Sequence, residues 1–203
     1  MVMADALRTC ATADDFGAYL TKRLGSQLGS RTNFCVIDGA GNAEIFEVHN
    51  RGFKRIPAAD APEFYLVNTN FSRSGAPNKG SGYLRFDRES QVLAQAPGGR
   101  LSYPFILQTA ARDLGHMLLR HPERSSWHSL PADTSFFIHT NHTIDRPSTA
   151  ASVVIRGVRK GEDPANAVMW VVLGEPVMSV AVPLWVNAGQ VPGPVQSGAL
   201  CAE

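Results

Sequence analysis

Three apolar runs in the last third of the chain constrain its fold more than any other feature. They are TAASVVIRGV at 149–158, NAVMWVVLG at 166–174 and VMSVAVPLWV at 177–186. RKGEDPAN separates the first two runs and GEP separates the last two, and connections this short favour antiparallel pairing. Because the runs are apolar at successive positions, we expect a sheet that is covered on both faces. SFFIHT at 135–140 is a further candidate strand.

The N-terminal part predicts a helix followed by a hairpin. Apolar side chains recur every four residues in the helix over 12–25, which Thr12 or Asp14 can cap. In NFCVIDGAGNAEIFEVHN at 33–50, two β-rich runs flank a Gly- and Asn-containing turn. Cys35 and Ile37 then face one side of the hairpin and Val36 the other. A strand over 52–56 can extend this sheet.

The middle of the chain predicts one more strand and two helices. FYLVNTN at 64–70 reads as a strand. A helix is expected over 87–96, with PGG as its stop, and another from Ser102 to just before Pro122. This order gives an α+β protein whose helices gather in the middle, and two sheets sandwiched between helices would satisfy it. We expect one domain over 1–186 and a Gly/Pro-rich tail over 187–203.

Composition narrows the classes of function. Of 203 residues, 44% are hydrophobic and 18% charged, which is typical of a globular protein. The net charge of +1 argues against a broad electrostatic surface for nucleic acid or an anionic membrane. No stretch is long and apolar enough for a membrane-spanning helix. We therefore expect neither nucleic acid nor a membrane as partner, and a cytoplasmic location as the default for the chain as given.

The cysteines and histidines carry little signal. Cys10, Cys35 and Cys201 form no paired motif, which predicts neither a disulfide framework nor a zinc site. Cys35, between apolar strand residues, is expected to be a buried small hydrophobe, and no cysteine has local support for a depressed pKa. His139 and His142 should point to opposite faces of a strand, so we expect no metal or other cofactor.

Two polar stretches are harder to explain by structure alone. In FYLVNTNFSRSG at 64–75, amides and hydroxyls follow an apolar run. They can cap backbone groups, or Asn68 or Asn70 can direct an amide N–H into a pocket as an oxyanion donor. HTNHTIDRPSTAAS at 139–152 is also polar and joins two strands. Arg146, held extended by the proline that follows it, is either a surface charge or a carboxylate-binding group.

Several segments together resemble the acyl-CoA:6-aminopenicillanic acid acyltransferase-like, or carcinine hydrolase-like, proteins. These are N-terminal-nucleophile hydrolases related to the choloylglycine hydrolases. The resemblance covers roughly residues 10–186. It rests on NFCVIDGAGNAEIFEVHN, FYLVNTNFSRSG, GSGYLRFDRE, FILQTAARDL and IDRPSTAASVVIRGV followed by MWVVLGEPVMSVAVPLWV.

This resemblance implies an αββα sandwich and an enzyme that hydrolyses an amide or transfers its acyl group. The nucleophile would be the thiolate of a mature N-terminal cysteine whose own α-amine is the base. Asn70, with Asn68 beside it, matches the oxyanion donor, and Arg146 matches an arginine near the nucleophile. The implied partner is a small-molecule amide or acyl substrate, with no cofactor.

The chain departs from the family at its start. Nothing in it matches the nucleophile and first strands, so the sequence resembles the C-terminal two-thirds of a family member. Two hypotheses follow. In the first, the chain is part of an amide hydrolase or acyltransferase that another segment completes, or whose true start lies upstream of Met1; the expected partner is then a missing N-terminal segment or a homo-oligomer. In the second, the chain is a truncated, non-catalytic paralogue or binding module that keeps the pocket wall. A structural α+β domain is a third reading if the resemblance is due to chance. An exposed apolar sheet edge or face would favour truncation or a missing partner.

Overall fold

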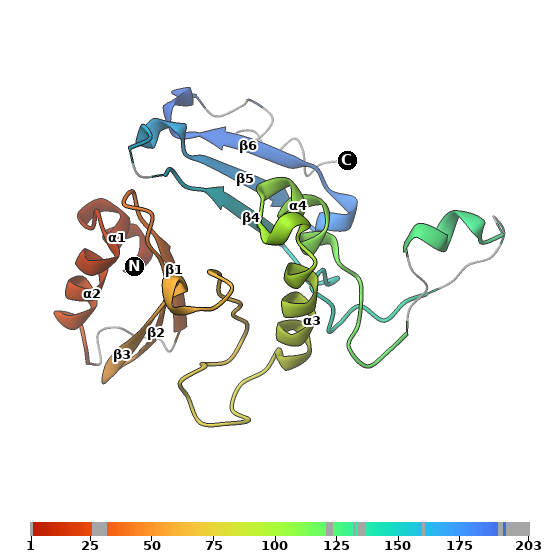
Figure 1. The fold of residues 1–203 in the computed structure, drawn as a ribbon, viewed down its shortest axis with the longest axis horizontal. Coiled ribbons are helices and arrows are strands. Elements are labelled where there is room, and N and C mark those ends of the chain that lie inside the picture. Colours follow the sequence, from red (N-terminus) through yellow and green to blue (C-terminus); the bar gives the residue numbers. More distant parts are fainter. Residues whose placement is uncertain are drawn as a thin grey trace.

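Two three-stranded antiparallel sheets organise the chain, and helices lie beside each of them (Figure 1). The computed structural model describes residues 2–25, 32–120, 124–131, 133, 137–159, 161–190 and 193. The fold is α+β, as the order of elements predicted. One sheet is built from the N-terminal part of the chain and the other from the C-terminal part.

The first sheet has the strand order β1–β2–β3. Its strands are β1 (Thr32–Ile37), β2 (Ala43–His49) and β3 (Gly52–Pro57). Asp38 closes the β1–β2 turn, because its carboxylate accepts hydrogen bonds from the backbone N–H groups of Ala40 and Asn42. The predicted hairpin and the strand after it are confirmed.

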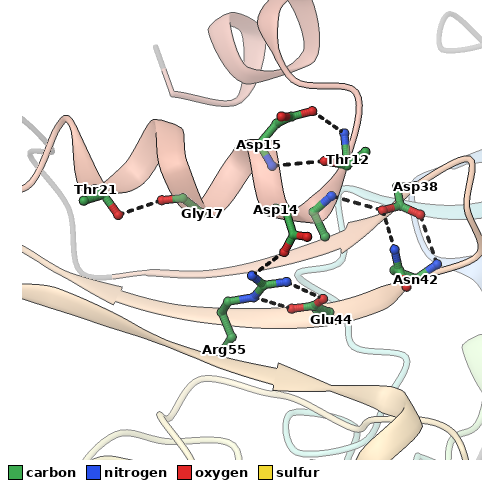
Figure 2. Close-up of polar contacts among 10 residues, drawn as sticks. Thr12, Asp14, Asp15, Gly17, Thr21, Asp38, Asn42, Glu44 and Arg55 are labelled. Atoms are coloured by element: carbon green, nitrogen blue, oxygen red, sulfur yellow. Dashed lines mark hydrogen bonds and ion pairs between the residues drawn. The ribbon is translucent and has the colours of Figure 1, made fainter.

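Two helices, α1 (Val2–Thr9) and α2 (Ala13–Thr21), cover one face of this sheet. Phe16 of α2 packs edge-on against the ring of Phe46, with centroids 5.0 Å apart. Thr12 caps α2 by accepting from the Asp15 N–H, while the Asp15 carboxylate accepts from the Thr12 N–H (Figure 2). The predicted helix therefore begins where expected and ends four residues early, at Thr21.

An ion-pair cluster fixes α2 to the sheet. Arg55 on β3 donates to both carboxylate oxygens of Glu44 on β2, at 2.8 and 2.7 Å, and to Asp14 of α2 at 2.6 Å (Figure 2). The carboxylate of Asp38 also accepts from the N–H of Ala13, in the first turn of α2. These bonds set the angle of α2 and leave the opposite face of the sheet free for other contacts.

The second sheet has the order β4–β5–β6. Its strands are β4 (Ala151–Arg156), β5 (Val168–Leu173) and β6 (Ala181–Trp185), and each pair is antiparallel as predicted. The helix α4 (Tyr103–Gln108) lies against one face, where the Tyr103 ring stacks on that of Trp170 with centroids 5.3 Å apart.

The other face of the second sheet is exposed, so the prediction of cover on both faces is wrong. Val153, Ile155 and Leu173 are 52%, 56% and 43% exposed. The alternation along β4 is regular, which means that one face packs and the other meets solvent. Continuous apolar character did not indicate burial here because α4 packs against one face alone.

The two middle helices differ from prediction in their bounds. α3 (Tyr83–Ala94) begins four residues before the expected residue 87. Ser102 caps α4 as predicted, but α4 ends at Gln108 rather than near Pro122. A 3-10 turn follows α4 at Ala110–Arg112. Beyond that turn, the side chain of Asp113 accepts from the N–H of Gly115 and competes with helical hydrogen bonding there.

The predicted strand over 64–70 does not form. Phe64 adopts a φ of 57°, which interrupts an extended run. Val67 is buried against Val92 and Leu93 of α3 rather than in a sheet. Residues 137–140 also form no strand, and 135–136, like most of the predicted tail, lie outside the described residues. Short 3-10 turns complete the fold at Ala58–Asp60, Pro97–Gly99, Ala110–Arg112, Arg124–Ser129, Pro164–Asn166, Pro176–Met178 and Val186–Ala188.

Candidate functional site

Residues 64–75, here called the site segment, lie against the face of the first sheet that α1 and α2 leave free. Alternation along β1 and β2 places Asn33, Cys35 and Glu47 on this face. Two of them, Asn33 and Glu47, hold the site segment by hydrogen bonds. The candidate site is therefore a loop fixed to a sheet and not the end of a strand.

Glu47 of β2 holds the end of the site segment. Its side chain is buried, and its carboxylate accepts from the backbone N–H groups of Arg73 and Ser74 and from the Ser74 hydroxyl. A buried carboxylate needs such donors, since an unpaired charge in an apolar setting is costly. Ser74 and the backbone of Arg73 thus have a structural role.

Asn33 of β1 holds the middle of the segment. Its side-chain nitrogen donates to the carbonyl oxygen of Phe71 at 3.0 Å and to Oδ1 of Asn68 at 3.4 Å. The side-chain nitrogen of Asn68 in turn donates to the carbonyl oxygen of Thr69. Because both ends of the Asn68 amide have partners within the protein, Asn68 positions the loop.

Asn70 differs from Asn68, because only the oxygen of its side-chain amide has a hydrogen-bond partner among the described residues. Its Oδ1 accepts from Nη2 of Arg85, in the first turn of α3. A guanidinium group can only donate, so the oxygen of Asn70 must face Arg85 and the amide nitrogen must face away. Asn70 is exposed, and no described residue accepts a hydrogen bond from its amide nitrogen. Two N–H groups are thus available to a ligand.

The backbone of Asn70 is also held in place. Its carbonyl oxygen accepts from the Ser81 N–H at 3.0 Å. Gly80 makes this approach possible: its φ is +109°, and a Cβ at that position would lie 2.6 Å from the Asn70 oxygen. Only glycine fits such a conformation and such a distance.

Two clefts meet at the site segment, and Asn68 and Thr69 line both of them. The first, here called the apolar cleft, has a volume of about 500 Å³ and lies between the first sheet, α3 and the site segment. The second, the polar cleft, has a volume of about 780 Å³ and contains Asn70. Both volumes suit a small organic molecule. The polar residues lining the second are Thr32, Asn33, Glu47, His49, Asn68, Thr69, Asn70, Ser72, Ser74 and Lys79.

Arg146 is the third residue predicted for the site. Arg85 lines the apolar cleft together with Ile144, two residues before Arg146 in the chain. Burial, and then the positive charge of Arg146, lower the pKa of Arg85. The structure therefore joins Asn70 to Arg85 by a hydrogen bond, whereas Arg146 lines neither cleft and is related to Arg85 only through its charge.

Glu89 is a further titratable group in the apolar cleft, one helical turn after Arg85. Burial, and then the negative charge of Asp113, raise its pKa to about 7. Asp113 itself forms a two-bond ion pair with Arg88, at 2.7 and 2.6 Å. A carboxyl with a pKa near neutrality can donate or accept a proton under physiological conditions.

Cys35 lines the apolar cleft but is exposed, so the prediction that it is buried is wrong. The sheet continues to pair around it, yet its face is only partly covered. Neighbouring atoms still desolvate the sulfur and raise the pKa of the thiol. An activated nucleophile needs a depressed pKa, so Cys35 has the opposite property. Cys10 is half-buried, and Cys201 lies outside the described residues.

The histidines also differ from prediction. The rings of His139 and His142 lie 6.1 Å apart, with that of His116 at 5.9 and 6.1 Å from them. They do not point to opposite faces because this stretch is not a strand. Within the described ranges, no three His, Cys, Asp or Glu side chains are grouped so that they could hold a metal ion. No described helix is long and apolar enough to cross a membrane.

Sequence reasoning missed four contributors to the site: Asn33, Glu47, Arg85 and Glu89. One signal for Glu47 was present, since a single acidic residue inside the apolar run IFEVH needs donors wherever it is buried. Nothing local distinguishes Arg85 or Glu89 from the other charges of GSGYLRFDRES. Their role depends on contacts with distant loops.

Comparisons with known proteins add no relative. No protein-family model matches the chain, and no curated protein or solved structure matches it significantly. The fold and the site thus define an α+β protein with a small-molecule-sized pair of clefts, and its function has to be argued from the residues that line them.

Proposed function

We propose that this chain carries the carbonyl-binding part of an amide hydrolase or acyltransferase of the penicillin acyltransferase-like type. The observation that carries the proposal is Asn70, which lines the polar cleft. Its side-chain oxygen accepts from Arg85, and no residue that the structure describes accepts from its amide nitrogen. A neutral amide N–H with a fixed direction is a good donor to an oxygen that becomes negatively charged.

In this proposal Asn70 acts when a thiolate attacks the carbonyl carbon of a substrate amide. The carbonyl π electrons move to the oxygen, where the Asn70 N–H stabilises the new charge. Collapse of the intermediate breaks the C–N bond, and the amine leaves with a proton. The resulting thioester then passes its acyl group to water or to another amine.

The attacking thiolate would be that of an N-terminal cysteine outside these 203 residues. Cys35 is a poor candidate because it lines the apolar cleft rather than the polar one, and its pKa is raised. The proposal therefore assigns the recognition of the carbonyl to this chain and the covalent step to another segment.

The four-layer αββα arrangement belongs to the same proposal. Each sheet carries helices on one face, and the second sheet leaves an apolar face exposed at Val153, Ile155 and Leu173. An exposed apolar face supports an incomplete sandwich more than a finished two-layer domain.

A second candidate is a non-catalytic binding module. The raised pKa of Cys35, the only described cysteine that lines either cleft, favours it. Such a module would bind a small acyl compound through the same open amide of Asn70 without cleaving it.

Octanamide and the chromogenic octanoyl p-nitroanilide test both candidates on the chain and on the longest protein its gene encodes. Asn70→Ala should weaken octanamide binding about 5- to 10-fold, the effect of one hydrogen bond. If the protein is an enzyme, turnover of the anilide should fall about 100- to 1,000-fold, as for loss of an oxyanion donor.

Asn187→Ala is the matched control, since Asn187 is an exposed amide in the 3-10 turn Val186–Ala188. Turnover that depends on Asn70 supports the enzyme. Asn70-dependent binding with no turnover by the longest protein supports the binding module. If Asn70→Ala and Asn187→Ala bind octanamide equally well, both candidates are wrong.

A further inference from the structure

One carboxyl group of the apolar cleft has no partner within the part of the chain that the structure describes. Glu89 of α3 lines this cleft, and no described residue forms a hydrogen bond or an ion pair with its carboxylate. Glu44 lines the same cleft, but its carboxylate accepts two hydrogen bonds from Arg55. The charge of Glu89 is therefore left for a ligand to balance.

The pitch of α3 places Glu89 among mainly apolar groups. Arg85, Glu89 and Leu93 recur every four residues, so they lie on one face of the helix, and all three line the cleft. The first sheet contributes Cys35 and Ile45, which are paired residues of β1 and β2. An ionised carboxyl in such surroundings is costly unless a cation pairs with it.

The arginine on the same face of α3 does not supply that cation. Nη2 of Arg85 donates to the side-chain oxygen of Asn70. The guanidinium also lies close to Gly82, three residues before Arg85, since a Cβ on Gly82 would be 2.6 Å from Nη2. It therefore extends toward the start of α3, whereas Glu89 lies one turn toward the end of the helix.

Asp113 increases the need for a cation at Glu89. Burial, and then the negative charge of Asp113, raise the pKa of Glu89 to about 7. Arg88 is already committed to Asp113 by two hydrogen bonds of 2.7 and 2.6 Å. A positively charged ligand group beside Glu89 would stabilise its ionised form against both effects.

We propose that Glu89 is the ammonium-binding group of the apolar cleft, and that this cleft takes a small primary amine with an apolar body. A volume of about 500 Å³ accommodates a chain of several carbons or an aromatic ring. Ile37, Leu66 and Ile144 are among the residues that would surround this body. A primary ammonium is compact and has three N–H donors, so it can pair with Glu89 at the end of a carbon chain. A carboxylic acid fits less well, because its charge would repel that of Glu89.

The amine site and the Asn70 site are connected. Asn68 and Thr69 line both clefts, so one molecule can reach from one cleft into the other. Binding of an amine by Glu89 does not require acyl transfer. As a statement that this amine is the one released by hydrolysis or acylated by transfer at Asn70, the inference rests on the proposed function.

The charged and titratable groups around Glu89 come from several walls of the cleft. They are Cys35 of β1, Glu44 of β2, Tyr65 of the site segment, Arg85 and Arg88 of α3, and Asp113. Because these groups share one cleft or lie beside it, the pH dependence of binding has to be compared with that of Glu89→Gln, which removes the titration of this carboxyl alone.

Binding of hexylamine, 1-hexanol and hexanoate to the whole chain tests the site by calorimetry. Hexylamine should bind at least about 10-fold more tightly than 1-hexanol at pH 8, the effect of one charge-assisted hydrogen bond. Equal affinity for these two ligands, or tighter binding of hexanoate than of hexylamine, would overturn the proposal. This comparison uses the unmodified protein and so does not depend on the folding of any variant.

The pH dependence gives a second readout on the unmodified protein. An alkylammonium stays protonated between pH 6 and pH 8, whereas about nine-tenths of Glu89 is protonated at pH 6 before the amine binds. Hexylamine should therefore bind about 10-fold more weakly at pH 6 than at pH 8, and its binding at pH 7 should release about half a proton. The affinity for 1-hexanol should not show this rise with pH. Equal hexylamine affinity at pH 6 and pH 8 would contradict the assignment of Glu89.

Variants then locate the binding group. Glu89→Gln should weaken hexylamine binding at pH 8 about 10- to 100-fold, to the level of 1-hexanol, and should abolish the change between pH 6 and pH 8. Asp87→Asn is the matched control, because it also removes one negative charge from α3 but at an exposed position outside the cleft. Equal effects of the two changes on hexylamine binding would show a general charge effect and refute the site.

The two proposals fail in different ways. The amine site is tested with Glu89→Gln and hexylamine, and the proposed function with Asn70→Ala, octanamide and anilide turnover. Loss of hexylamine binding in Glu89→Gln, together with unchanged octanamide binding in Asn70→Ala, would keep the amine site and reject the carbonyl donor. The reverse pattern would keep the carbonyl donor and reject the amine site.

Discussion

Removal of the Glu47 carboxylate should destabilise the protein and disorder the site segment together. Glu47 is 4% exposed and accepts three hydrogen bonds, two from Ser74 and one from the backbone of Arg73. Hydrogen bonds to a charged group contribute about 1.5–3 kcal/mol each. Ser74 and Arg73 are themselves exposed, so water can replace part of each bond, and about 1 kcal/mol per bond is the appropriate figure. The expected loss for Glu47→Ala is therefore about 3 kcal/mol.

Glu47→Gln should cost less, about 1–2 kcal/mol, because one side-chain oxygen remains to accept from Ser74 while the amide nitrogen faces the Arg73 N–H. Urea unfolding followed by tryptophan fluorescence measures both values. The midpoint should fall while the slope with urea stays constant, since the surface exposed on unfolding barely changes. Glu63→Gln, at an exposed position in the loop before the site segment, controls for the loss of one negative charge.

Amide hydrogen exchange gives the local test. The N–H groups of Arg73 and Ser74 should exchange faster in Glu47→Ala than in Glu63→Gln, because their acceptor has gone. A Glu47→Ala protein within about 0.5 kcal/mol of the original, with unchanged exchange at Ser74, would refute the conclusion that Glu47 holds the segment.

Three further predictions concern ionisable groups. Burial opposes the charge of Asp38, but hydrogen bonds from Asn42 and from backbone N–H groups outweigh it and lower the pKa of Asp38 below 3.8. Asp38→Ala should thus cost about 1–3 kcal/mol at pH 7, and the difference should vanish as the pH falls through the folded-state pKa. The pKa of Glu89 is shifted in the opposite direction, from 4.5 in the unfolded chain to about 7 in the folded protein. The stability that the protonated group provides is therefore lost as the pH rises from about 4.5 to about 7, so Glu89→Gln should stabilise by about 2–3 kcal/mol at pH 8 and by nothing at pH 4 in urea titrations. Cys35→Ser should leave anilide turnover unchanged, and the Cys35 thiol should react with a disulfide reagent at pH 7.5 more slowly than free cysteine does.

The local parts of the fold were predictable because their causes lie within a few residues. Thr12 and Ser102 cap helices through contacts three residues away. The three strands of the second sheet follow one another through short turns, so their antiparallel order followed from the connection lengths alone.

Failures occurred where a distant residue decided the outcome. The apolar residues FYLV gave the pattern of a buried strand, but Val67 found its partners on α3, and the chain turned at Phe64 instead of entering a sheet. The helix from Ser102 ended at Gln108, and in the segment beyond it Asp113 pairs with Arg88, 25 residues earlier, instead of lying in a helix. Apolar periodicity reports that a residue is buried and does not report what buries it.

The same reasoning explains why only part of the candidate site was found. Asn68 and Asn70 have the same side chain and lie two residues apart, so the sequence could not rank them. The structure ranks them by their partners: Asn33 and Thr69 occupy the amide of Asn68, whereas Arg85 takes only the oxygen of Asn70. The functional reading of the segment depends on this difference.

Structural and functional roles in the site segment are therefore linked rather than alternative. Stabilisation of a developing negative charge is effective when the donor is already in place, so that no free energy is spent on reorienting it. Glu47 fixes one end of the loop, Asn33 fixes the middle, and Arg85 fixes the direction of the Asn70 amide. If Asn70 binds a substrate carbonyl, residues that never touch the substrate determine how well it does so. Glu47→Ala should then lower anilide turnover even under conditions where the protein remains fully folded, and Asn70→Ala in that background should add less than it does alone. Full additivity of the two changes would show that the loop anchors and the amide act independently, which would contradict this account of the segment.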